Sequence, residues 1–376
     1  MSKKLLFCFE NYYPYVGGAE ILYKNILEGL VKKGYDVTLV THHIKETKNY
    51  EKLNGVKIHR IKCFENRFLF PLFASKKLWS LSKESSSITT STYTALPLAS
   101  LIGLFRNKQT IAIIHELWIN KWSRYTDLSV MKKIFFSIFE RIIYMFKVDI
   151  YIPVSDSTKK QLLSYGIKKN KIHRIYNGMD YSHWDSKKYS ITDVTKELNI
   201  KRNSFKAIFY GRPGTSKGLP YLINAVPHII KKIPNFKLIA IVSNGPEHKK
   251  DFDRIYNLIQ RLNIQDNVTL KPSVSYKKLP EYVKYSNIVI VPSLAEGFGF
   301  SAYEACLMGK PLVVSKTTSL PEVVFGKVNF SVPKDSRSIA SAVIKSYKKD
   351  FTRIPKKDFT VETMVDNYAK FYSKEK

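Results

Sequence analysis

Short apolar runs rich in β-branched residues alternate with segments of helical periodicity through the first half of the chain. Residues 19–33 show clear helical spacing, with apolar positions on one face and a stop at Gly34. Alternation of this kind is typical of parallel α/β layers. The apolar runs predict strands at residues 4–9, 36–41, 56–61, 110–114 and 149–154, with a weaker, more polar strand at 87–92 and a short one at 172–176.

The pattern restarts after a polar stretch, residues 182–203, which we interpret as the connection between two domains. Further strands are predicted at residues 207–210, 238–243, 268–270, 288–291 and 312–315. Two such halves predict an α/β fold of two doubly wound, Rossmann-like domains, residues 1–181 and 182–358, which face each other across a cleft at the carboxyl ends of their strands.

The last segment, residues 359–376, is predicted to hold a C-terminal helix. Met364, Val365 and Tyr368 lie on one face of it at helical spacing. Such a face needs a partner surface. Packing back on the N-terminal domain is one of the two arrangements that would cover it.

Length and cysteine usage bound the class of protein. A chain of 376 residues with three cysteines and no CxxC spacing indicates two domains in a reducing compartment, without a zinc site or a disulfide framework. The N-terminal apolar run is too short for a signal peptide, and no apolar stretch reaches the roughly 18 residues that span a bilayer. We therefore expect a cytoplasmic protein.

The formal net charge of +31 is the strongest anomaly of composition. It is spread evenly, with 29 basic against 14 acidic residues in positions 1–180 and 33 against 17 in the remainder. Such a field suits nucleic acid, an anionic membrane surface or a phosphorylated substrate, and does not choose among them. The cations are mostly scattered lysines without a nucleic-acid-binding module, so general surface charge is an equally open interpretation.

The segment Glu296-Gly-Phe-Gly-Phe-Ser-Ala-Tyr-Glu304 places two carboxylates around a glycine loop between a predicted strand and a predicted helix. Backbone N–H groups at such a helix start can meet an anion, and carboxylates accept strong hydrogen bonds from sugar hydroxyls. The pattern therefore favours a site for polyols and phosphates. A surface turn with two solvated glutamates has the same spacing.

Three shorter patterns carry similar chemistry. The first follows a strand and is the loop Gly211-Arg-Pro-Gly-Thr-Ser-Lys-Gly218, in which Arg212 and Lys217 could bind a diphosphate. It is not a Walker loop, and an ordinary basic loop would have the same pattern. Gly17-Gly18 lies between the first strand and helix, where a backbone can approach a phosphate or simply turn tightly. His115-Glu116 ends a strand at a position typical of site residues, yet a lone histidine is often structural.

Two further segments bear on metals and membranes. Asp251-Phe-Asp253 spells an acidic metal-binding pattern but lies in a predicted helix among basic residues, so we assign no metal ligands. Residues 131–147 mix aromatic and basic side chains at helical spacing, which fits either core packing or a membrane interface. The basic and aromatic residues at 67–71 and 121–125 add to the membrane interpretation.

Taken in order along the chain, these motifs resemble those of retaining nucleotide-sugar glycosyltransferases of family 4, which have the GT-B architecture. The resemblance runs from residue 4 to about 370. Its motifs are Gly17-Gly18-Ala-Glu20, His115, Ile150-Tyr-Ile-Pro-Val-Ser155, Asn177-Gly-Met-Asp180, Gly211-Arg212 with Lys217-Gly218, Ser243-Asn-Gly-Pro-Glu247, Glu296 with Glu304, Pro311-Leu-Val-Val314 and Pro321-Glu-Val-Val324.

The resemblance implies roles for the matching residues. Arg212 and Lys217 would neutralise the donor diphosphate, and Glu304 would hold the ribose. The catalytic residues would be His115, beside the anomeric centre, Arg212, Lys217 and Glu296, which contacts the sugar. The donor site would comprise Gly17, Gly18, Gly211, Arg212, Lys217, Glu296, Gly297, Phe298, Gly299 and Glu304.

The resemblance also implies the reaction. The protein would move a hexose from UDP- or GDP-sugar, with no cofactor and no metal, to a lipid-linked or cell-envelope glycan. It would work in the cytoplasm, on the inner face of the membrane, without nucleic acid as a partner. A nucleotide-sugar epimerase or a phosphorylase of the same architecture, and a basic nucleic-acid-binding protein, are the alternatives.

Departures from the family pattern are visible as well. Relatives commonly have His-Asp at His115-Glu116, a Gly-Gly pair at Thr318-Ser319 and glycine at Ser243, and Lys271-Pro272 replaces another glycine. The first departure concerns the acceptor side. The others concern the shape of the loops around the donor.

Overall fold

The computed structural model describes residues 3–15, 17–64 and 66–374, which form two compact units. The first unit comprises residues 1–122, 130–179 and 359–376, and the second comprises 123–129 and 180–358. The predicted first domain, 1–181, included the segment 123–129. In the structure Asp127 of this segment pairs with Arg254 of the second unit at 2.8 Å.

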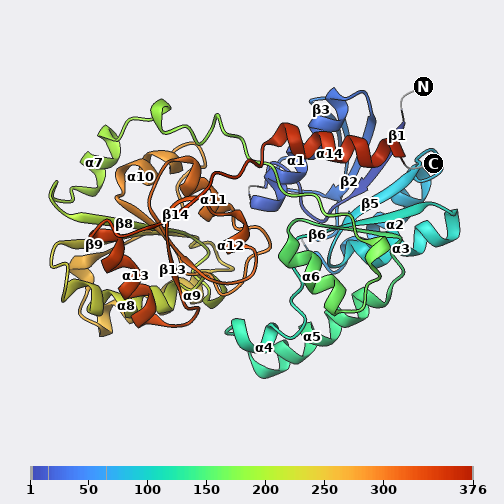
Figure 1. The fold of residues 1–376 in the computed structure, drawn as a ribbon. Coiled ribbons are helices and arrows are strands. Elements are labelled where there is room, and N and C mark those ends of the chain that lie inside the picture. Colours follow the sequence, from blue (N-terminus) through green and yellow to red (C-terminus); the bar gives the residue numbers. More distant parts are fainter. Residues whose placement is uncertain (1–2, 16, 65, 375–376) are drawn as a thin grey trace. The chain divides into compact units, whose positions relative to one another are not determined.

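The first unit is built on a seven-stranded sheet in the order β3-β4-β2-β1-β5-β6-β7 (Figure 1). Neighbouring strands are parallel except β3 and β4. The strands are β1 (Lys4–Cys8), β2 (Asp36–His42), β3 (Tyr50–Leu53), β4 (Val56–Ile61), β5 (Ser87–Ser91), β6 (Gln109–Ile114) and β7 (Ile150–Pro153).

Helices cover both faces of this sheet. They are α1 (Gly18–Lys32), α2 (Phe70–Leu81), α3 (Ala95–Arg106), α4 (Trp122–Tyr125), which runs into the 123–129 segment, α5 (Val130–Met145), α6 (Asp156–Ser164) and α14 (Val361–Lys374). The connections β4 to β5, β5 to β6 and β6 to β7 cross the sheet in one direction, and β1 to β2 crosses in the other. Right-handed crossovers therefore place α2, α3 and α5 on one face and α1 on the opposite face.

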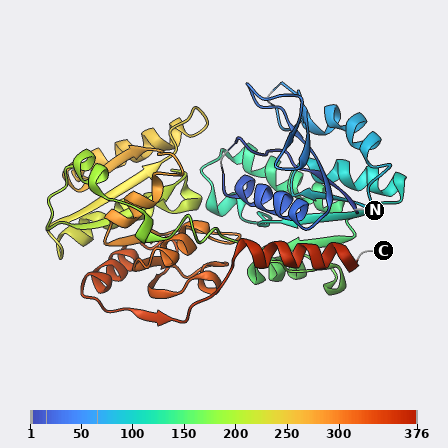
Figure 2. The ribbon, with the colours of Figure 1, turned by 90° about the horizontal axis from the view of Figure 1, so that it is seen from above.

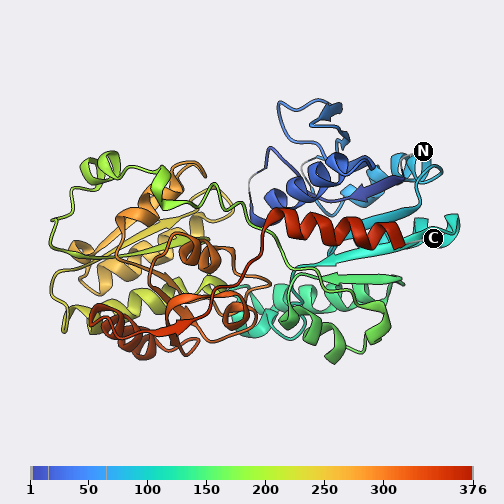
Figure 3. The same cartoon turned by 45° about the horizontal axis from the view of Figure 1, so that its top comes forward.

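The C-terminal helix α14 belongs to the first unit and packs along α1 (Figure 3). Val365 fills the space beside Gly29 of α1, and Tyr35 donates to Ala369 O at 2.9 Å. The view from above also shows α14, in red, beside the blue α1 (Figure 2). Near the start of β1, Lys3 Nζ donates to Tyr372 O at 2.6 Å. The apolar face of α14 is thus covered by this unit.

The second unit has a seven-stranded sheet in the order β10-β9-β8-β11-β12-β13-β14, with only β13 and β14 antiparallel. Its strands are β8 (Phe205–Gly211), β9 (Phe236–Val242), β10 (Val268–Pro272), β11 (Ile288–Val291), β12 (Leu312–Ser315), β13 (Gly326–Ser331) and β14 (Thr352–Ile354). Its helices are α7 (Thr192–Leu198), α8 (Leu219–Ile230), α9 (Lys249–Arg261), α10 (Leu279–Tyr285), α11 (Phe300–Leu307), α12 (Leu320–Val323) and α13 (Ser336–Tyr347).

The central strands of this sheet are buried on both faces. Every residue of β11 and β12 is buried, and α8 contributes Leu222, Val226 and Ile229 to the same core. Continuous apolar strands of this kind occur where helices cover both sides of a parallel sheet. The predicted fold of two doubly wound, Rossmann-like α/β domains is therefore confirmed.

Some expected strands differ from the structure. The run at 172–176 is not a strand in the structure. Ile172 forms an isolated bridge to Tyr151, and Ile175 N donates to Pro153 O of β7 at 3.2 Å without extending this bridge into a ladder. Three strands were missed, namely β3, β13 and β14. They lie at sheet edges or pair with an edge strand, so their polar residues break the apolar pattern that marks central strands. Within the described part of the chain, no helix has the length and apolar character of a membrane span.

Candidate functional site

Two loops of the second unit lie against each other at the carboxyl ends of β8 and β11, the edge where parallel α/β sheets place their ligands. The first loop follows Gly211, and the Leu294 backbone N–H of the second donates to Ser216 O of the first at 2.8 Å. Gly218 has a φ of +75°, and a Cβ there would overlap the Pro292 carbonyl oxygen. Only glycine fits this crossing.

Lys217 and Glu296, two residues predicted for the site, form an ion pair between these loops. Lys217 Nζ donates to Glu296 Oε1 at 2.6 Å, and Ser293 Oγ donates to the same oxygen at 2.7 Å. The side chains are 24% and 11% exposed, so the pair is largely shielded from water. The second predicted cation, Arg212, is exposed, and among the described residues no hydrogen bond or ion pair holds it.

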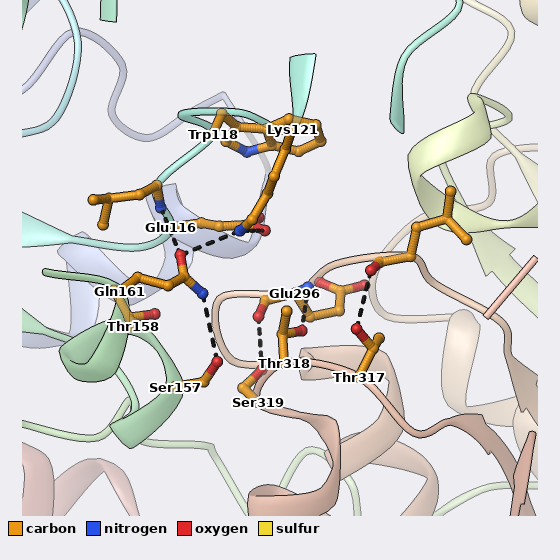
Figure 4. A network of polar contacts seen from close by, with 12 residues as sticks. Glu116, Trp118, Lys121, Ser157, Thr158, Gln161, Glu296, Thr317, Thr318 and Ser319 are labelled. Carbon is orange, nitrogen blue, oxygen red and sulfur yellow. Dashed lines mark hydrogen bonds and ion pairs between the residues drawn. The ribbon is translucent and has the colours of Figure 1, made fainter. Parts of the chain in front are cut away.

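Three consecutive hydroxyl side chains, Thr317–Ser319, hold the loop that carries Glu296 (Figure 4). We call them the hydroxyl clamp. Thr318 Oγ1 accepts from the Glu296 backbone N–H at 2.9 Å. Ser319 Oγ lies 2.8 Å from Glu296 O and 2.9 Å from Phe298 O, so one hydroxyl proton serves two carbonyls. Thr318 has a φ of +43°, which is rare for a β-branched residue. The departure from the family's Gly-Gly pair therefore creates new side-chain contacts to the loop.

The predicted amide donors Gly297, Phe298 and Gly299 lead directly into α11. Gly299 turns the chain with a φ of +97°, and a Cβ there would lie 2.7 Å from Leu320 Cδ2. The first N–H groups of an α-helix have no acceptor within the helix, which makes this end suited to an anion.

Glu304 lies on α11 and is buried. Burial raises the pKa of Glu304 to about 7, while a hydrogen bond from Tyr210 and the positive charge of Lys217 partly offset that effect. Tyr210 also donates to Ser301 O at 3.0 Å, which fixes the phenol beside the carboxyl group. Near neutral pH the carboxyl group therefore exchanges a proton readily and can accept hydrogen bonds from ligand hydroxyls.

In the first unit, His115 follows β6 and is held by a phenol. Its Nε2 lies 2.6 Å from the Tyr23 hydroxyl, and Tyr23 stacks on Phe9 with ring centroids 3.9 Å apart. Thr158 Oγ1 donates to His115 O at 3.1 Å. Burial lowers the pKa of His115 to about 4, so the imidazole is neutral at physiological pH. It can exchange hydrogen bonds there but carries no charge.

Glu116, which replaces the family's aspartate, enters a polar network at the same edge (Figure 4). Lys121 Nζ lies 3.0 Å from Glu116 Oε1 and 3.1 Å from Gln161 Oε1. Gln161 Nε2 in turn points to Ser157 Oγ at 3.5 Å. The longer carboxylate is thus neutralised by an adjacent lysine within the first unit.

Gly17 and Gly18 stand at the start of α1, where Gly17 is the N-cap in an extended conformation. A Cβ at Gly17 would overlap the Glu20 carboxylate, which therefore lies over the helix start. An incoming phosphate would have to displace this carboxylate, because both groups are anionic.

Sequence reasoning missed Glu10, which follows β1. Its Oε1 accepts from Thr94 N and Thr94 Oγ1, both at 2.6 Å, and its Oε2 lies 3.2 Å from Arg67. The adjacent Tyr93 has a φ of +86°, a strained conformation typical of functional sites. A glutamate directly after an apolar strand was a visible signal, but Thr94 and Arg67 lie far away in sequence.

The predicted residues therefore fall into two sets. Gly211, Arg212, Lys217, Glu296–Gly299 and Glu304 gather at one edge of the second unit, and Gly17, Gly18 and His115 belong to the first. Across the residues described by the structure, no group of three His, Cys, Asp or Glu side chains stands close enough to hold a metal ion.

Two family models match adjacent parts of the chain. The model of Glycosyltransferase Family 4 matches residues 16–183, and that of Glycosyl transferases group 1 matches residues 190–358. An uncharacterized glycosyltransferase of Methanocaldococcus jannaschii is 25% identical over 374 residues, which cover 94% of this chain and 93% of the relative. The phosphatidylinositol N-acetylglucosaminyltransferase GPI3 subunit of Saccharomyces cerevisiae is 22% identical, with 96% and 78% covered.

Solved structures resemble the chain over its whole length. HepE of Anabaena, in complex with UDP and glucose, has a TM-score of 0.79 at 19% identity, with 99% of both chains covered. WaaG, a glycosyltransferase involved in lipopolysaccharide biosynthesis, has a TM-score of 0.69 at 11% identity, with 98% of this chain and 95% of WaaG covered.

Proposed function

This chain belongs to the family 4-like glycosyltransferases of GT-B fold, and on that premise we propose that it transfers a hexose from a nucleotide diphosphate sugar to a glycan acceptor with retention of configuration. The observation that carries the proposal is the grouping of Lys217, Glu296 and Glu304 at the carboxyl edge of the second sheet. One cation and two carboxyls there match the diphosphate and the hydroxyls of such a donor.

Donor binding exchanges one set of polar contacts for another. The diphosphate takes Lys217 from Glu296, and Arg212, which is exposed, adds a forked contact to the phosphate oxygens. The freed Glu296 accepts hydroxyls of the transferred sugar. Glu304 accepts the ribose hydroxyls, and these donors favour its ionised form against the burial that raises its pKa to about 7.

The chemical step breaks the bond between the anomeric carbon and the β-phosphate oxygen and forms a bond from the same carbon to the acceptor oxygen. Negative charge builds on the leaving phosphate, where Lys217 and Arg212 stabilise it in the transition state. The leaving phosphate oxygen takes the acceptor proton on the same face of the sugar, which keeps the configuration. The neutral His115 serves as a hydrogen-bonding group beside the anomeric centre. No metal takes part in this proposal.

UDP- or GDP-hexose is the proposed donor. Its support is the fold of HepE, whose structure holds UDP and glucose. A lipid-linked or cell-envelope glycan is the proposed acceptor, in the cytoplasm at the inner face of the membrane. Two relatives support it, since one is named for phosphatidylinositol and WaaG for lipopolysaccharide biosynthesis.

Thermal stability against UDP, GDP, ADP and their hexose conjugates, with and without EDTA, tests the donor site. We expect one nucleotide family to raise the Tm of the wild type, independently of EDTA, and to do so no longer in Glu304→Ala. The anomeric configuration of the product, read by NMR with the stabilising donor, tests retention. A flat response across the panel, or an inverted product, contradicts the proposal.

A further inference from the structure

The outer surface of α2, α3 and α5 in the first unit carries an unusual number of exposed apolar side chains. Together with Arg67 and Phe68 before α2, we call this surface the apolar–basic face. Met145 is 80% exposed, Met131 76%, Phe105 73% and Leu72 70%. The other exposed apolar residues of the face are Phe68, Phe73, Trp79, Leu101, Leu104, Val130, Ile134, Phe135, Ile138 and Ile142.

Helix α5 has two apolar sides. One side buries Ile143 and Tyr144 in the core of the unit. The other side exposes Met131, Ile134, Ile138, Ile142 and Met145 at intervals of three or four residues, which forms a continuous stripe. Core packing, one of the two interpretations of residues 131–147, therefore accounts for only half of this helix. The exposed stripe contributes nothing to the core and exceeds what the fold needs.

The three helices share one surface. They cover the same face of the sheet, and the buried sides of α2 and α3 enter one core cluster while α3 and α5 enter another. The Arg106 guanidinium of α3 lies 4.0 Å from the Trp79 ring of α2, and Phe68 packs edge-on to Phe139 of α5 at 5.6 Å. The apolar residues thus form one patch rather than scattered positions.

The charge on this face has a single sign. Its basic residues are Arg67, Lys76, Lys77, Arg106, Lys132, Lys133 and Arg141. The one acidic residue within the three helices, Glu140, is buried, and it accepts from Trp118 N and Trp122 Nε1 at 2.7 Å each. Outward from these helices, cations surround apolar side chains. Arg67 pairs with Glu10 at 3.2 Å, and among the described residues no carboxylate pairs with the other six cations.

We propose that the apolar–basic face docks on an anionic phospholipid surface, with its cations at the headgroups and its apolar side chains among the first acyl carbons. Each lysine or arginine near such a surface strengthens binding about fivefold, and exposed apolar side chains supply the remainder. A second copy of this chain fits poorly because like charges would meet. Nucleic acid would engage the cations but leave the apolar stripe in water.

The proposal deepens the proposed function, since a lipid-linked acceptor lies at such a surface. It rests on the proposed function only for the biological role of lipid binding. Lipid binding is measurable without any donor. Flotation of the full-length protein with vesicles of phosphatidylglycerol and phosphatidylcholine, and with phosphatidylcholine alone, tests it at low and high salt. We expect binding to the anionic vesicles only, weakened but not abolished by salt.

Paired variants separate this face from general surface charge. Met131→Glu/Ile138→Glu should lower vesicle binding at least tenfold, and Lys132→Glu/Lys133→Glu should lower it similarly at low salt. Leu163→Glu and Lys159→Glu/Lys160→Glu on α6 are the matched controls and should bind like the wild type. Stabilisation by the donor nucleotide in every variant shows that the fold and the donor site are intact.

Three results would overturn the proposal. The first is a wild type that stays unbound with anionic vesicles at low salt. The second is equal loss of binding in the α6 controls, which would assign binding to scattered charge. The third is a wild-type dimer in light scattering that Met131→Glu/Ile138→Glu converts to a monomer, because the occupant of the face would then be a second copy. If no nucleotide or nucleotide sugar raises the Tm while the protein still floats with anionic vesicles, only the proposed function is contradicted.

Discussion

The carboxyl edges of the two sheets present polar groups in opposite ways. In the second unit, Lys217 pairs with Glu296 at 2.6 Å, and its positive charge also acts on the buried carboxyl group of Glu304. This lysine can therefore exchange a carboxylate partner for a charged ligand. In the first unit, Glu116 is neutralised by Lys121 and His115 is uncharged. The second edge therefore carries charges that suit the proposed charged donor, whereas the first carries a neutralised carboxylate and an uncharged imidazole.

The two edges also differ in how their loops are fixed. At the second edge, the backbone crossing at Gly218 and the hydroxyl clamp hold the loops in place. At the first edge, the long side chains of Gln161, Lys121 and Glu10 hold the loops in place. Rigid backbone geometry suits electrostatic stabilisation, which depends on groups that need no rearrangement during reaction. Changes at the second edge should therefore have the larger effects.

Among the predicted changes, Gly218→Ala should disrupt the loops of the second edge most. The new Cβ would overlap the Pro292 carbonyl oxygen in a backbone of φ +75°, so we expect a loss of roughly 3 kcal/mol or more in the free energy of unfolding. Donor stabilisation should vanish with it. Urea denaturation measures the first effect and a thermal shift with nucleotide measures the second.

Gly309→Ala is its matched control. Gly309 also has a positive φ, +68°, but nothing lies within 4 Å of an added Cβ. It should cost only about 1 kcal/mol, the strain of a left-handed residue. Equal losses in the two variants would mean that the loop crossing has no special importance.

Lys217→Ala should lower kcat by about 10²–10³-fold, with a smaller change in KM, because charge on the leaving phosphate grows toward the transition state. Steady-state kinetics with a saturating acceptor measures both constants. Lys231→Ala, an exposed lysine at the end of α8, should match the wild type. Turnover that survives in Lys217→Ala would remove this lysine from the leaving-group role.

The pH dependence of stability should sharpen the contrast between the units. Burial raises the pKa of Glu304 from 4.5 to about 7, so the unfolded chain releases this proton first and stability falls as pH rises through that window. Glu304→Gln should remove the loss and be more stable than the wild type at pH 8 by up to roughly 3 kcal/mol. At pH 4.5 the two should be alike.

His115 should act in the opposite direction. Burial lowers its pKa from 6.5 to about 4, so the unfolded chain binds this proton first and stability falls as pH drops through that window. In His115→Gln, the free energy of unfolding should fall less at acid pH than in the wild type, and its dependence on alkaline pH should be unchanged. Urea midpoints from pH 4 to 8 measure both pH ranges, with Glu362→Gln, an exposed carboxyl on α14, as control. Parallel curves for all variants would refute both assignments.

These comparisons explain what sequence could and could not predict. The central strands were found because burial on both faces demands continuous apolar runs, as at 288–291 and 312–315. The loops at Gly218 and Gly299 were recognised because tight backbone geometry requires glycine at fixed spacing. Both signals are local in sequence.

The remaining contacts depend on residues far apart in the chain. Glu10 contacts Thr94 across 84 positions. Its place directly after an apolar strand was visible in the sequence, but nothing near it indicates Thr94 as its partner. Lys121 meets Gln161 across 40 positions in the same way. The apolar residues of α5 were visible in sequence, but which side is exposed depends on how the helix packs.

The hydroxyl clamp is the smallest of the predicted effects and the one that most sharply tests whether backbone contacts preorganise the second edge. Ser319→Ala removes the donor to Glu296 O and Phe298 O, which should cost about 1–2 kcal/mol of stability. The loop that carries Glu296 should loosen, so we expect KM for the donor to rise several-fold while kcat changes less. Ser315→Ala is the control, because the buried Ser315 hydroxyl on β12 has no hydrogen-bond partner among the described residues. It should leave KM unchanged and cost little stability. If both variants behave alike, the clamp serves packing only, and the preorganisation of the second edge must come from the glycine crossing alone.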